Sequence, residues 1–233
     1  MNSIVAAIIT LLIALSFLRL MDFFAHKGWI ENRLSRKLIH IGTGPLFVLC
    51  WLLFPDVPSA RWLAALVPLM IVLQFALVGL GVMKDEASVQ AMSRTGDRRE
   101  ILRGPLFYGI MFVALTVVYW KDSPIGIVAL MMMCGGDGIA DIIGRRVKSP
   151  KLPWSSEKSI AGSLSVFIGG WTLSAIILFV YVSLGVFHSP FNSYLMSITV
   201  IASGCMLIES LPFKDIDNIT VTLAAVVLGY LFF

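Results

Sequence analysis

Two aspartates lie four residues apart in the segment GGDGIADIIGRR, residues 135–146. In a helix this spacing places Asp137 and Asp141 on one face, one turn apart. Two carboxylates that face one point suit Mg²⁺, which takes oxygen ligands and shares its coordination shell with substrate phosphates. The segment follows the apolar run IGIVALMMMC, and an ionised aspartate near hydrocarbon usually marks a functional site. The spacing therefore predicts a magnesium site; the plainer alternative is a helix end with two solvated aspartates.

Five basic residues follow in the next loop: Arg145, Arg146, Lys148, Lys151 and Lys158. Basic loops are also what membrane orientation alone requires, so part of this set need only fix topology. Arg145 and Arg146 lie nearest the carboxylates and are candidates for binding phosphate. Lys158 is a third candidate, because PWSSEKSIAGS begins the next apolar segment. A serine there could cap a helix whose N–H groups would be free for a phosphate. The candidate caps are Ser155, Ser156 and Ser159.

A second basic motif, SRKLIHIGTGP, spans residues 35–45 at the start of another apolar segment. Arg36 and Lys37 could close on a nucleotide phosphate from this helix. His40 lies three residues beyond Lys37, about one helical turn further into the membrane. A histidine in this place could act as a general base. The alternative is an interfacial histidine bonded to a backbone carbonyl, and the sequence leaves both interpretations open.

Acidic residues recur near the C-terminal end, in IESLPFKDIDNITV at residues 208–221. Glu209 ends one apolar run, and Asp217 and Asn218 open the last one. Asp217 could be only a helix cap. The loop nevertheless lies on the same predicted side of the membrane as the motifs above. We therefore count Glu209, Asp217 and Asn218 among the candidate residues of a metal and phosphate site, with Glu209 as a candidate catalytic residue. Glu100, in RTGDRREILRGPLFYG, could orient an arginine of the site or pair with a loop charge.

The composition indicates that the helices that position these residues lie in a membrane. Hydrophobic residues make up 58% of the 233 residues and charged residues 14%, against about 45–50% apolar and 25% charged in soluble domains. Only an integral membrane protein fits both departures. Three cysteines lie in or beside apolar runs, with no spacing typical of a disulfide framework or a zinc site. We predict an all-α, polytopic bundle of transmembrane helices and no nucleic-acid partner.

A transmembrane helix needs about 20 apolar residues, with a range of about 17–25. The chain offers eight candidates, near residues 3–20, 38–54, 60–82, 104–120, 124–144, 160–187, 191–208 and 219–233. The apolar part of the fifth is too short alone, so this segment spans only if its helix continues through GGDGIADIIG. The second and last candidates are also short, so seven spans are an alternative. No separate soluble domain is present, and residues 1–233 form one transmembrane domain.

Sixteen of the eighteen Lys and Arg residues lie in the loops after the first, third, fifth and seventh candidates. Arg61 and Lys121 fall on the opposite side. The positive-inside rule then places the basic loops in the cytoplasm and both termini outside. No positive residue precedes the first apolar run, as a secretory signal peptide would require, so we expect a retained first span. Polar motifs far apart in sequence thus meet at one face of the bundle.

The motifs RKLIHIGTG, ILRGPLFYG, GGDGIADIIGRR, KLPWSSEKSIAGS and ES…DN occur in this order. In this combination the chain resembles the polyprenol kinase family, which includes dolichol kinase, phytol kinase and CTP-dependent diacylglycerol kinase. Its size and spans look most like phytol kinase. The resemblance implies a kinase-like core at about residues 35–220. It also implies transfer of phosphate from CTP to a membrane-resident alcohol such as phytol, geranylgeraniol or a polyprenol.

The resemblance associates the loop after the GDG motif and the later acidic-Asn segment with CTP binding. The residues carried over are Asp137, Asp141, Arg145, Arg146, Lys158, Glu209, Asp217 and Asn218. Reasoning from the residues alone reaches the same set as a metal and phosphate site. It leaves open whether Asp137, Glu209 or His40 accepts the proton of the alcohol. The acceptor alcohol and the oligomeric state are also open.

Other functions compete with a lipid-alcohol kinase. A phosphatidate cytidylyltransferase or a CDP-alcohol transferase would also use Mg²⁺ and a cytidine nucleotide. The second needs DxxDGxxAR…GxxxDxxxD, of which only one Asp-x₃-Asp pair is present. A membrane transporter would share intramembrane charges and glycine-rich segments. However, no internal repeat is visible, and the charged motifs gather at one face rather than at the midplane. We therefore expect an enzyme, with Mg²⁺ as cofactor and CTP as co-substrate.

Overall fold

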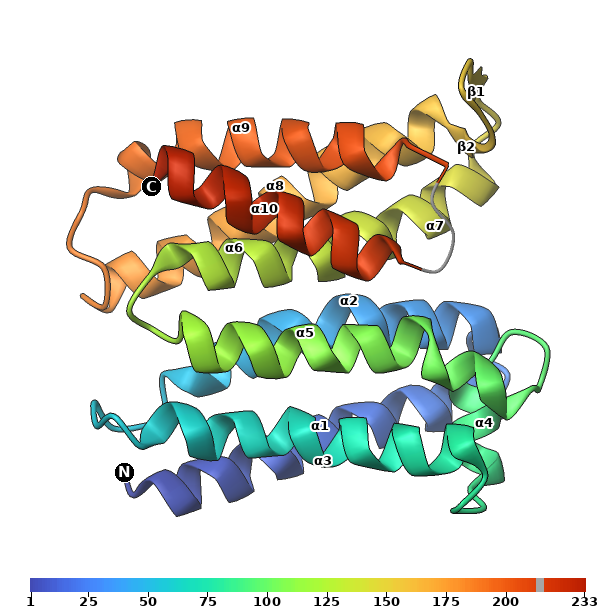
Figure 1. The fold of residues 1–233 in the computed structure, drawn as a ribbon, viewed down its shortest axis with the longest axis horizontal. Coiled ribbons are helices and arrows are strands. Elements are labelled where there is room, and N and C mark those ends of the chain that lie inside the picture. The colour runs from blue at the N-terminus through green and yellow to red at the C-terminus, as the bar shows by residue number, and fades with distance from the viewer. Residues whose placement is uncertain (213–215) are drawn as a thin grey trace.

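The computed structural model describes residues 1–212 and 216–233, and these are almost entirely helical (Figure 1). Lys214, one of the basic loop residues, lies outside the described residues. The described strands are β1 (Lys151–Leu152) and β2 (Ser155–Ser159), an antiparallel pair. The described helices are α1 (Ser3–His26), α2 (Asn32–Trp51), α3 (Ala60–Leu80), α4 (Glu86–Met92), η1 (Arg98–Leu102), α5 (Gly104–Val118), α6 (Pro124–Met131), η2 (Met132–Asp137), α7 (Gly138–Arg146), α8 (Ile160–Ser183), α9 (Phe191–Glu209) and α10 (Asp217–Phe232).

Each of the eight predicted spans overlaps a helical segment of the described chain. Six segments are long and apolar enough to cross a membrane: α1, α3, η1 with α5, the run from α6 to α7, α8 and α9. The other two are α2, whose first turns carry the basic motif, and α10, an apolar helix of 16 residues. The prediction of an all-α, polytopic membrane bundle is therefore confirmed. Both termini lie at the same end of the bundle (Figure 1), as an even number of crossings requires.

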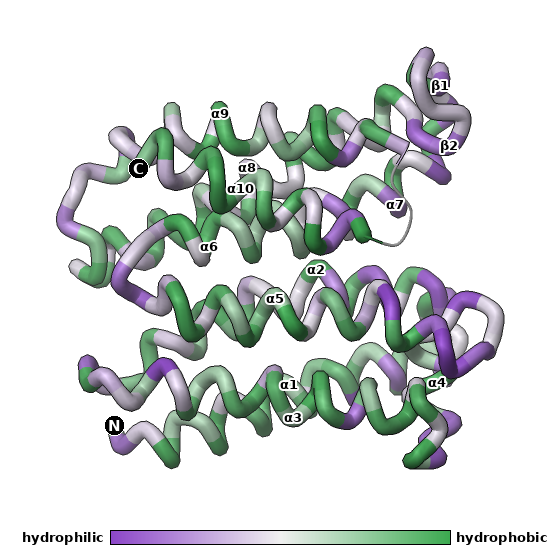
Figure 2. The backbone as a smooth tube through the Cα atoms, viewed as in Figure 1, coloured by the Kyte–Doolittle hydropathy of each residue, from purple (hydrophilic) through white to green (hydrophobic). Residues whose placement is uncertain are grey.

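Hydrophilic segments gather at the end of the bundle opposite the two termini. They lie around α4, α7 and the β1–β2 hairpin, and the helices that lead to them are mostly hydrophobic (Figure 2). The start of α2, the end of α9 and the start of α10 lie at the same end (Figure 1). The chemical motifs of the sequence thus meet at one end of the molecule, which we call the charged end.

The fifth segment is the central helix of the bundle. α6 continues through the π-helical turn η2 into α7, so the run Pro124–Arg146 is long enough to cross a membrane. Residues 127–134 are fully buried, with α2, α5, α8 and α10 packed around the segment. A π-helical turn is rare and often lies at a functional site. Here it ends at Asp137, which therefore starts the part of the segment that reaches the charged end.

Glycines allow neighbouring helices to approach the central segment closely. A Cβ atom on Gly135 would lie 2.8 Å from the backbone oxygen of Gly169 in α8. One on Gly138 would lie 2.3 Å from the side chain of Ile41 in α2. Small residues at such crossings are typical of membrane helix packing. The glycines around Asp137 therefore bring α8 and the basic first turns of α2 close to the carboxylate pair.

Gly169→Ala is expected to lower the stability of the bundle by about 1–3 kcal/mol, the usual cost of overpacking a tight core. The added methyl group would lie 2.5 Å from the backbone oxygen of Gly135, and backbone cannot move aside as a flexible side chain can. Thermal unfolding in detergent measures the loss. Thr172→Ala is the matched control, because Thr172 is exposed on the same helix. Equal Tm values for the two variants would contradict the tight crossing.

The β1–β2 hairpin differs from the prediction, because the sequence indicates helices only. The hairpin joins α7 to α8 and holds a two-stranded antiparallel pair. Trp154, between the strands, donates from Nε1 to the backbone oxygen of Ser210 at 3.1 Å. This bond ties the hairpin to the end of α9. Lys158 is therefore presented from a strand that is anchored beside α9, rather than from a loose loop.

Candidate active site

Two adjoining cavities lie at the charged end. The larger, of about 650 Å³, is formed by α7, the β1–β2 hairpin, α8, the facing ends of α9 and α10, and residues from the α4–α5 region. The smaller, of about 190 Å³, lies among α1, α2, α3 and α5, and apolar side chains form much of its wall. We call them the polar cavity and the apolar cavity, and the wall that they share the junction. The junction consists of Lys37, Met92, Arg94, Gly104, Pro105, Asp137, Asp141 and Asn218.

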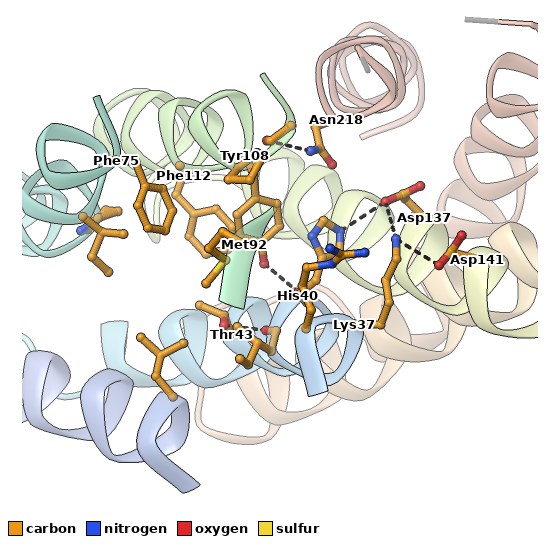
Figure 3. Close-up of a pocket in the computed structure, with 18 of the residues that line it drawn as sticks. Lys37, His40, Thr43, Phe75, Met92, Tyr108, Phe112, Asp137, Asp141 and Asn218 are labelled. Atoms are coloured by element: carbon orange, nitrogen blue, oxygen red, sulfur yellow. Dashed lines mark hydrogen bonds and ion pairs between the residues drawn. The ribbon is translucent and has the colours of Figure 1, made fainter. Parts of the chain in front are cut away.

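The predicted carboxylate pair lies at the junction and faces α2 (Figure 3). Lys37 Nζ lies 3.7 Å from Asp137 Oδ2 and 3.9 Å from Asp141 Oδ2. His40 Nε2 lies 3.4 Å from the same oxygen of Asp137. The side chains of Asp137 and Asp141 are 19% and 21% exposed, so a ligand in either cavity can reach them. The structure therefore joins two motifs that are about a hundred residues apart.

Two arginines hold Asp141 from the outer side. Arg33 Nη2 lies 3.2 Å from both of its carboxylate oxygens, and Arg145 Nε donates to Oδ1 at 2.8 Å. Arg145 is one of the predicted phosphate ligands. From the sequence, Arg33 is only one of the basic loop residues that set membrane orientation. Its spacing to Lys37, four residues on, is a signal that could have placed both on one helix face. Asp141 is thus the more heavily paired of the two aspartates.

The structure supports the second of the two interpretations of His40, a histidine bonded to a backbone carbonyl. Its Nε2 lies 3.2 Å from the backbone oxygen of Met133, as well as facing Asp137. A carbonyl oxygen only accepts, so Nε2 carries the hydrogen and cannot take a proton from a substrate. Tyr108 packs on the imidazole, with ring centroids 4.3 Å apart, and its hydroxyl donates to the backbone oxygen of His40 at 2.6 Å. His40 is therefore held in place to orient Asp137.

A second charged cluster lies at the far side of the polar cavity. Lys158 Nζ lies 2.5 Å from Glu209 Oε1 and 3.3 Å from Asp217 Oδ2. Burial favours the neutral lysine, but the two carboxylates outweigh it and raise the pKa of Lys158 above its usual value. Glu209 is 5% exposed. Its Oε2 and the Oδ1 of Asp217 are buried without a hydrogen-bond partner among the described residues. These two oxygens are therefore hydrogen-bond acceptors that a bound ligand could satisfy at this end of the cavity.

The expectation of free N–H groups at the start of α8 is wrong for its first three residues. Ser159 is the cap and accepts from the N–H of Gly162 at 3.2 Å. The N–H of Ile160 donates to the backbone oxygen of Pro150 at 3.0 Å, and that of Ala161 donates to Ser149 Oγ at 3.0 Å. Ser149 and Pro150, which precede β1, and Ser159 supply these acceptors, so this helix start has little left to offer a phosphate except its dipole.

The remaining predicted residues have separate places. Arg36 lines the apolar cavity and donates from Nη1 to the backbone oxygen of Ser93 at 2.7 Å, so it ties α2 to the segment after α4. Asn218 lies at the junction. Arg146 is exposed at the end of α7 and lines neither cavity, so its phosphate role stays a prediction. Glu100 accepts from the backbone N–H groups of Arg94 and Thr95, within its own loop.

Three relatives are similar to nearly the whole chain. Probable phytol kinase 1, chloroplastic, of Oryza sativa subsp. japonica is 43% identical over 222 residues, which cover 94% of this chain and 71% of that protein. Phytol kinase 1, chloroplastic, of Arabidopsis thaliana is 42% identical over 209 residues, covering 89% and 69%. Farnesol kinase, chloroplastic, of Arabidopsis thaliana is 38% identical over 227 residues, covering 97% and 74%. Neither a family model nor a solved structure matches the chain.

A multi-pass bundle that joins an apolar cavity to a charged one fits a membrane enzyme that acts on a lipid. The similarity to phytol and farnesol kinases narrows this class to lipid-alcohol kinases. The chain belongs to the polyprenol kinase family. The family resemblance drawn from the motifs is thereby confirmed.

Proposed function

We propose that this lipid-alcohol kinase transfers the γ-phosphate of CTP to the hydroxyl of a membrane-resident isoprenoid alcohol, giving the lipid monophosphate. One observation carries the proposal: an apolar cavity and a polar cavity share a wall that contains Asp137 and Lys37. Relatives named phytol kinase and farnesol kinase support an isoprenoid acceptor. CTP as the donor rests on the resemblance of the motifs to the family.

The apolar cavity suits the tail of the alcohol. From the junction it continues past Tyr108 to Phe112 and Phe75, which lie at the side away from Asp137 (Figure 3). Burying a hydrocarbon chain there stabilises the complex by up to about 0.8 kcal/mol for each CH₂ removed from water. With its tail in this cavity, the alcohol presents its hydroxyl at the junction. The acceptor then need not leave the bilayer to react.

The left-over acceptors of the second cluster indicate which way the nucleotide lies in the polar cavity. A triphosphate at neutral pH carries acceptors only, so it cannot satisfy Glu209 Oε2 or Asp217 Oδ1. The hydrogen-bond donors of a nucleotide are its ribose hydroxyls and the N–H groups of its base. We therefore place the nucleoside near Glu209 and Asp217, and the phosphates toward Lys37 and Arg145. This assigns Asp217 to the nucleoside rather than to phosphate.

The residues at the junction fit a magnesium ion that the nucleotide helps to hold. Asp137 and Asp141 supply two carboxylates, and the described residues hold no cluster of three or more His, Cys, Asp or Glu that could bind a metal alone. Mg²⁺ in phosphoryl-transfer sites is typically bound by one or two carboxylates, with substrate phosphates and water completing the shell. Bound at these two aspartates, it would neutralise charge on the phosphate oxygens.

In the proposed reaction the alcohol oxygen attacks the γ-phosphorus, and the bond from that phosphorus to the β,γ-bridging oxygen breaks, so CDP leaves. The hydroxyl proton passes to Asp137, and Lys37 neutralises developing charge on the phosphoryl oxygens. Asp137 is the best placed of the three candidate proton acceptors. Glu209 lines only the polar cavity and is paired with Lys158. His40 presents the protonated Nε2 to Asp137.

We also propose that the charged end faces the cytoplasm, because the loops predicted on that side carry sixteen of the eighteen Lys and Arg residues. CTP is charged and water-soluble, so it must approach the polar cavity from that side. This orientation also places both termini outside. Cysteine labelling with a membrane-impermeant reagent in sealed vesicles tests it, at an exposed loop residue of each end.

Lys158→Ala is expected to raise the KM for nucleotide more than the KM for alcohol. Lys158 lines the polar cavity and not the apolar one, and its loss leaves Glu209 and Asp217 without their shared cation. Initial rates over a matrix of both substrates measure the two constants. Lys27→Ala is the matched control, because Lys27 is exposed at the end of α1. A selective rise in the KM for alcohol would place Lys158 elsewhere in the mechanism.

The function itself is tested with purified protein in nanodiscs. The protein is offered γ-labelled CTP, UTP or ATP with Mg²⁺ and a panel of farnesol, geranylgeraniol, phytol, a polyprenol and diacylglycerol. The expected result is label on an isoprenoid alcohol, with CTP as the preferred donor and CDP as the second product. Label on diacylglycerol alone would redirect the proposal to a diacylglycerol kinase. Release of pyrophosphate from CTP with phosphatidic acid would establish a cytidylyltransferase instead. A folded protein that leaves every nucleotide untouched would favour a transporter.

A further inference from the structure

Asn218 lies in the first turn of α10 and lines both cavities. Its Nδ2 donates to the backbone oxygen of Gly104 at 3.1 Å, which fixes how the amide is turned. Figure 3 shows this bond, with the side-chain oxygen on the other side of the amide. That oxygen, Oδ1, is buried and has no hydrogen-bond partner among the described residues. A buried acceptor without a partner is unfavourable, so a bound donor would stabilise the site.

The chemistry of Oδ1 limits what that donor can be. An amide oxygen is an acceptor, and so is every oxygen of a nucleotide phosphate at neutral pH, so the two repel. A phosphate could contact only the second hydrogen of Nδ2, and Oδ1 would stay unsatisfied. The donors of the nucleoside belong, in the proposed function, at the far side of the polar cavity. At the junction, the donors that remain are water and the hydroxyl of the alcohol in the apolar cavity, and the alcohol displaces water when it binds there.

We propose that Asn218 is the residue that positions the acceptor alcohol: its Oδ1 accepts a hydrogen bond from the substrate hydroxyl when the alcohol binds in the apolar cavity. The inference rests on the proposed function for the identity of the lipid. The bond holds the hydroxyl oxygen at the junction before the nucleotide arrives. Rotation about the C–O bond then turns the hydrogen from Asn218 to Asp137, which takes the proton as the new O–P bond forms. This role differs from the nucleotide-binding role that the family motif implies.

The test removes the donor from the ligand and the acceptor from the protein. Farnesol and its methyl ether share a tail and an oxygen, but only the alcohol has an O–H group. Their affinities for the protein in nanodiscs, without nucleotide, are measured by the shift in thermal unfolding. Wild type is expected to bind the alcohol about ten-fold more tightly than the ether, as one hydrogen bond to a buried acceptor provides. Asn218→Ala is expected to lose this preference and keep its affinity for the ether within about two-fold.

Tyr108→Phe is the matched control. Tyr108 also lines the apolar cavity, but its hydroxyl already donates to the backbone oxygen of His40 and lies 3.2 Å from Cys134 Sγ. This variant is expected to keep the preference for alcohol over ether. Because the readout is the change in preference, a general loosening of the cavity, which weakens both ligands alike, does not imitate the effect.

Two outcomes would overturn the role of Asn218. One is a wild-type protein that binds alcohol and ether equally, and this result does not depend on any variant. The other is Asn218→Ala with the preference for alcohol intact; if this variant also bound CTP more weakly, the residue would return to the nucleotide. The assay needs no phosphate transfer, so a protein that shows the preference but phosphorylates no alcohol would overturn the proposed function and leave the role of Asn218 standing.

Discussion

Asp137→Asn is expected to lower the rate of phosphate transfer by about 10³-fold or more, while the protein still inserts and folds. The substitution keeps the shape of the side chain but removes its charge. Loss of a proton acceptor alone costs about 10²–10⁴-fold in rate, and loss of the magnesium contact adds to it. The oxygen concerned lies within 4 Å of both Lys37 Nζ and His40 Nε2, whereas Asp141 is held by Arg33 and Arg145. Initial rates in nanodiscs with labelled nucleotide measure the loss.

Asp56→Asn is the matched control for this substitution. Asp56 is an aspartate at the opposite end of the bundle, 91% exposed and paired with Lys121. Asp56→Asn makes the same change in charge and shape at a residue that lines neither cavity. The rate of phosphate transfer by this variant should therefore stay near that of wild type. If Asp137→Asn kept most of its activity in a folded preparation, both the metal assignment and the proton-acceptor assignment would have to be abandoned.

Much of the fold could be predicted because a membrane imposes a simple rule on the sequence. A stretch that crosses hydrocarbon must be apolar and helical, so spans such as 60–82 and 191–208 are visible without any knowledge of packing. The fifth span was harder, since its polar half looks like a loop. The helix continues there because it is packed on α8 through Gly135 and Gly169, a contact that periodicity does not reveal.

The candidate site could be predicted as a set of residues but not as an arrangement. Spacing within one helix places Asp137 beside Asp141, and the same rule would have placed Arg33 beside Lys37. No local rule states that His40 hydrogen-bonds to Met133 or that Lys158 reaches Glu209, because tertiary packing brings these pairs together. The start of α8 shows the opposite error. Its N–H groups look free in sequence, but in the folded chain Ser149 and Pro150, just before β1, supply acceptors for two of them.

The proposed mechanism gives the two charged clusters different roles, because their surroundings differ. Lys158 faces two carboxylates at the far side of the polar cavity, where two buried acceptor oxygens have no hydrogen-bond partner among the described residues. Lys37 faces two carboxylates at the junction, where the apolar cavity also opens. In the proposed mechanism Lys158 binds and aligns the nucleotide. Lys37 lies where charge would develop during transfer, so its loss should act on the chemical step.

Lys37→Ala is therefore expected to lower kcat by about 10²–10³-fold, with a smaller effect on the KM for either substrate. The side chain is 16% exposed and lies within 4 Å of both junction aspartates, so its removal takes away the cation that they share and increases their repulsion of the incoming phosphate. Lys37→Arg should recover part of the rate, because it restores the charge with a different shape. Rates at saturating CTP and alcohol separate kcat from KM.

Lys158→Ala is the comparison that makes the experiment on Lys37 decisive. Both substitutions remove a lysine that is paired with two carboxylates, so a general effect of lost charge would give both variants the same kinetic profile. The proposed mechanism requires different profiles: a lower kcat for the Lys37 variant and a higher KM for nucleotide for the Lys158 variant. If Lys37→Ala changed only the KM for nucleotide, the transferred phosphoryl group would lie away from the junction. The reaction centre would then have to be moved toward Lys158, deeper in the polar cavity.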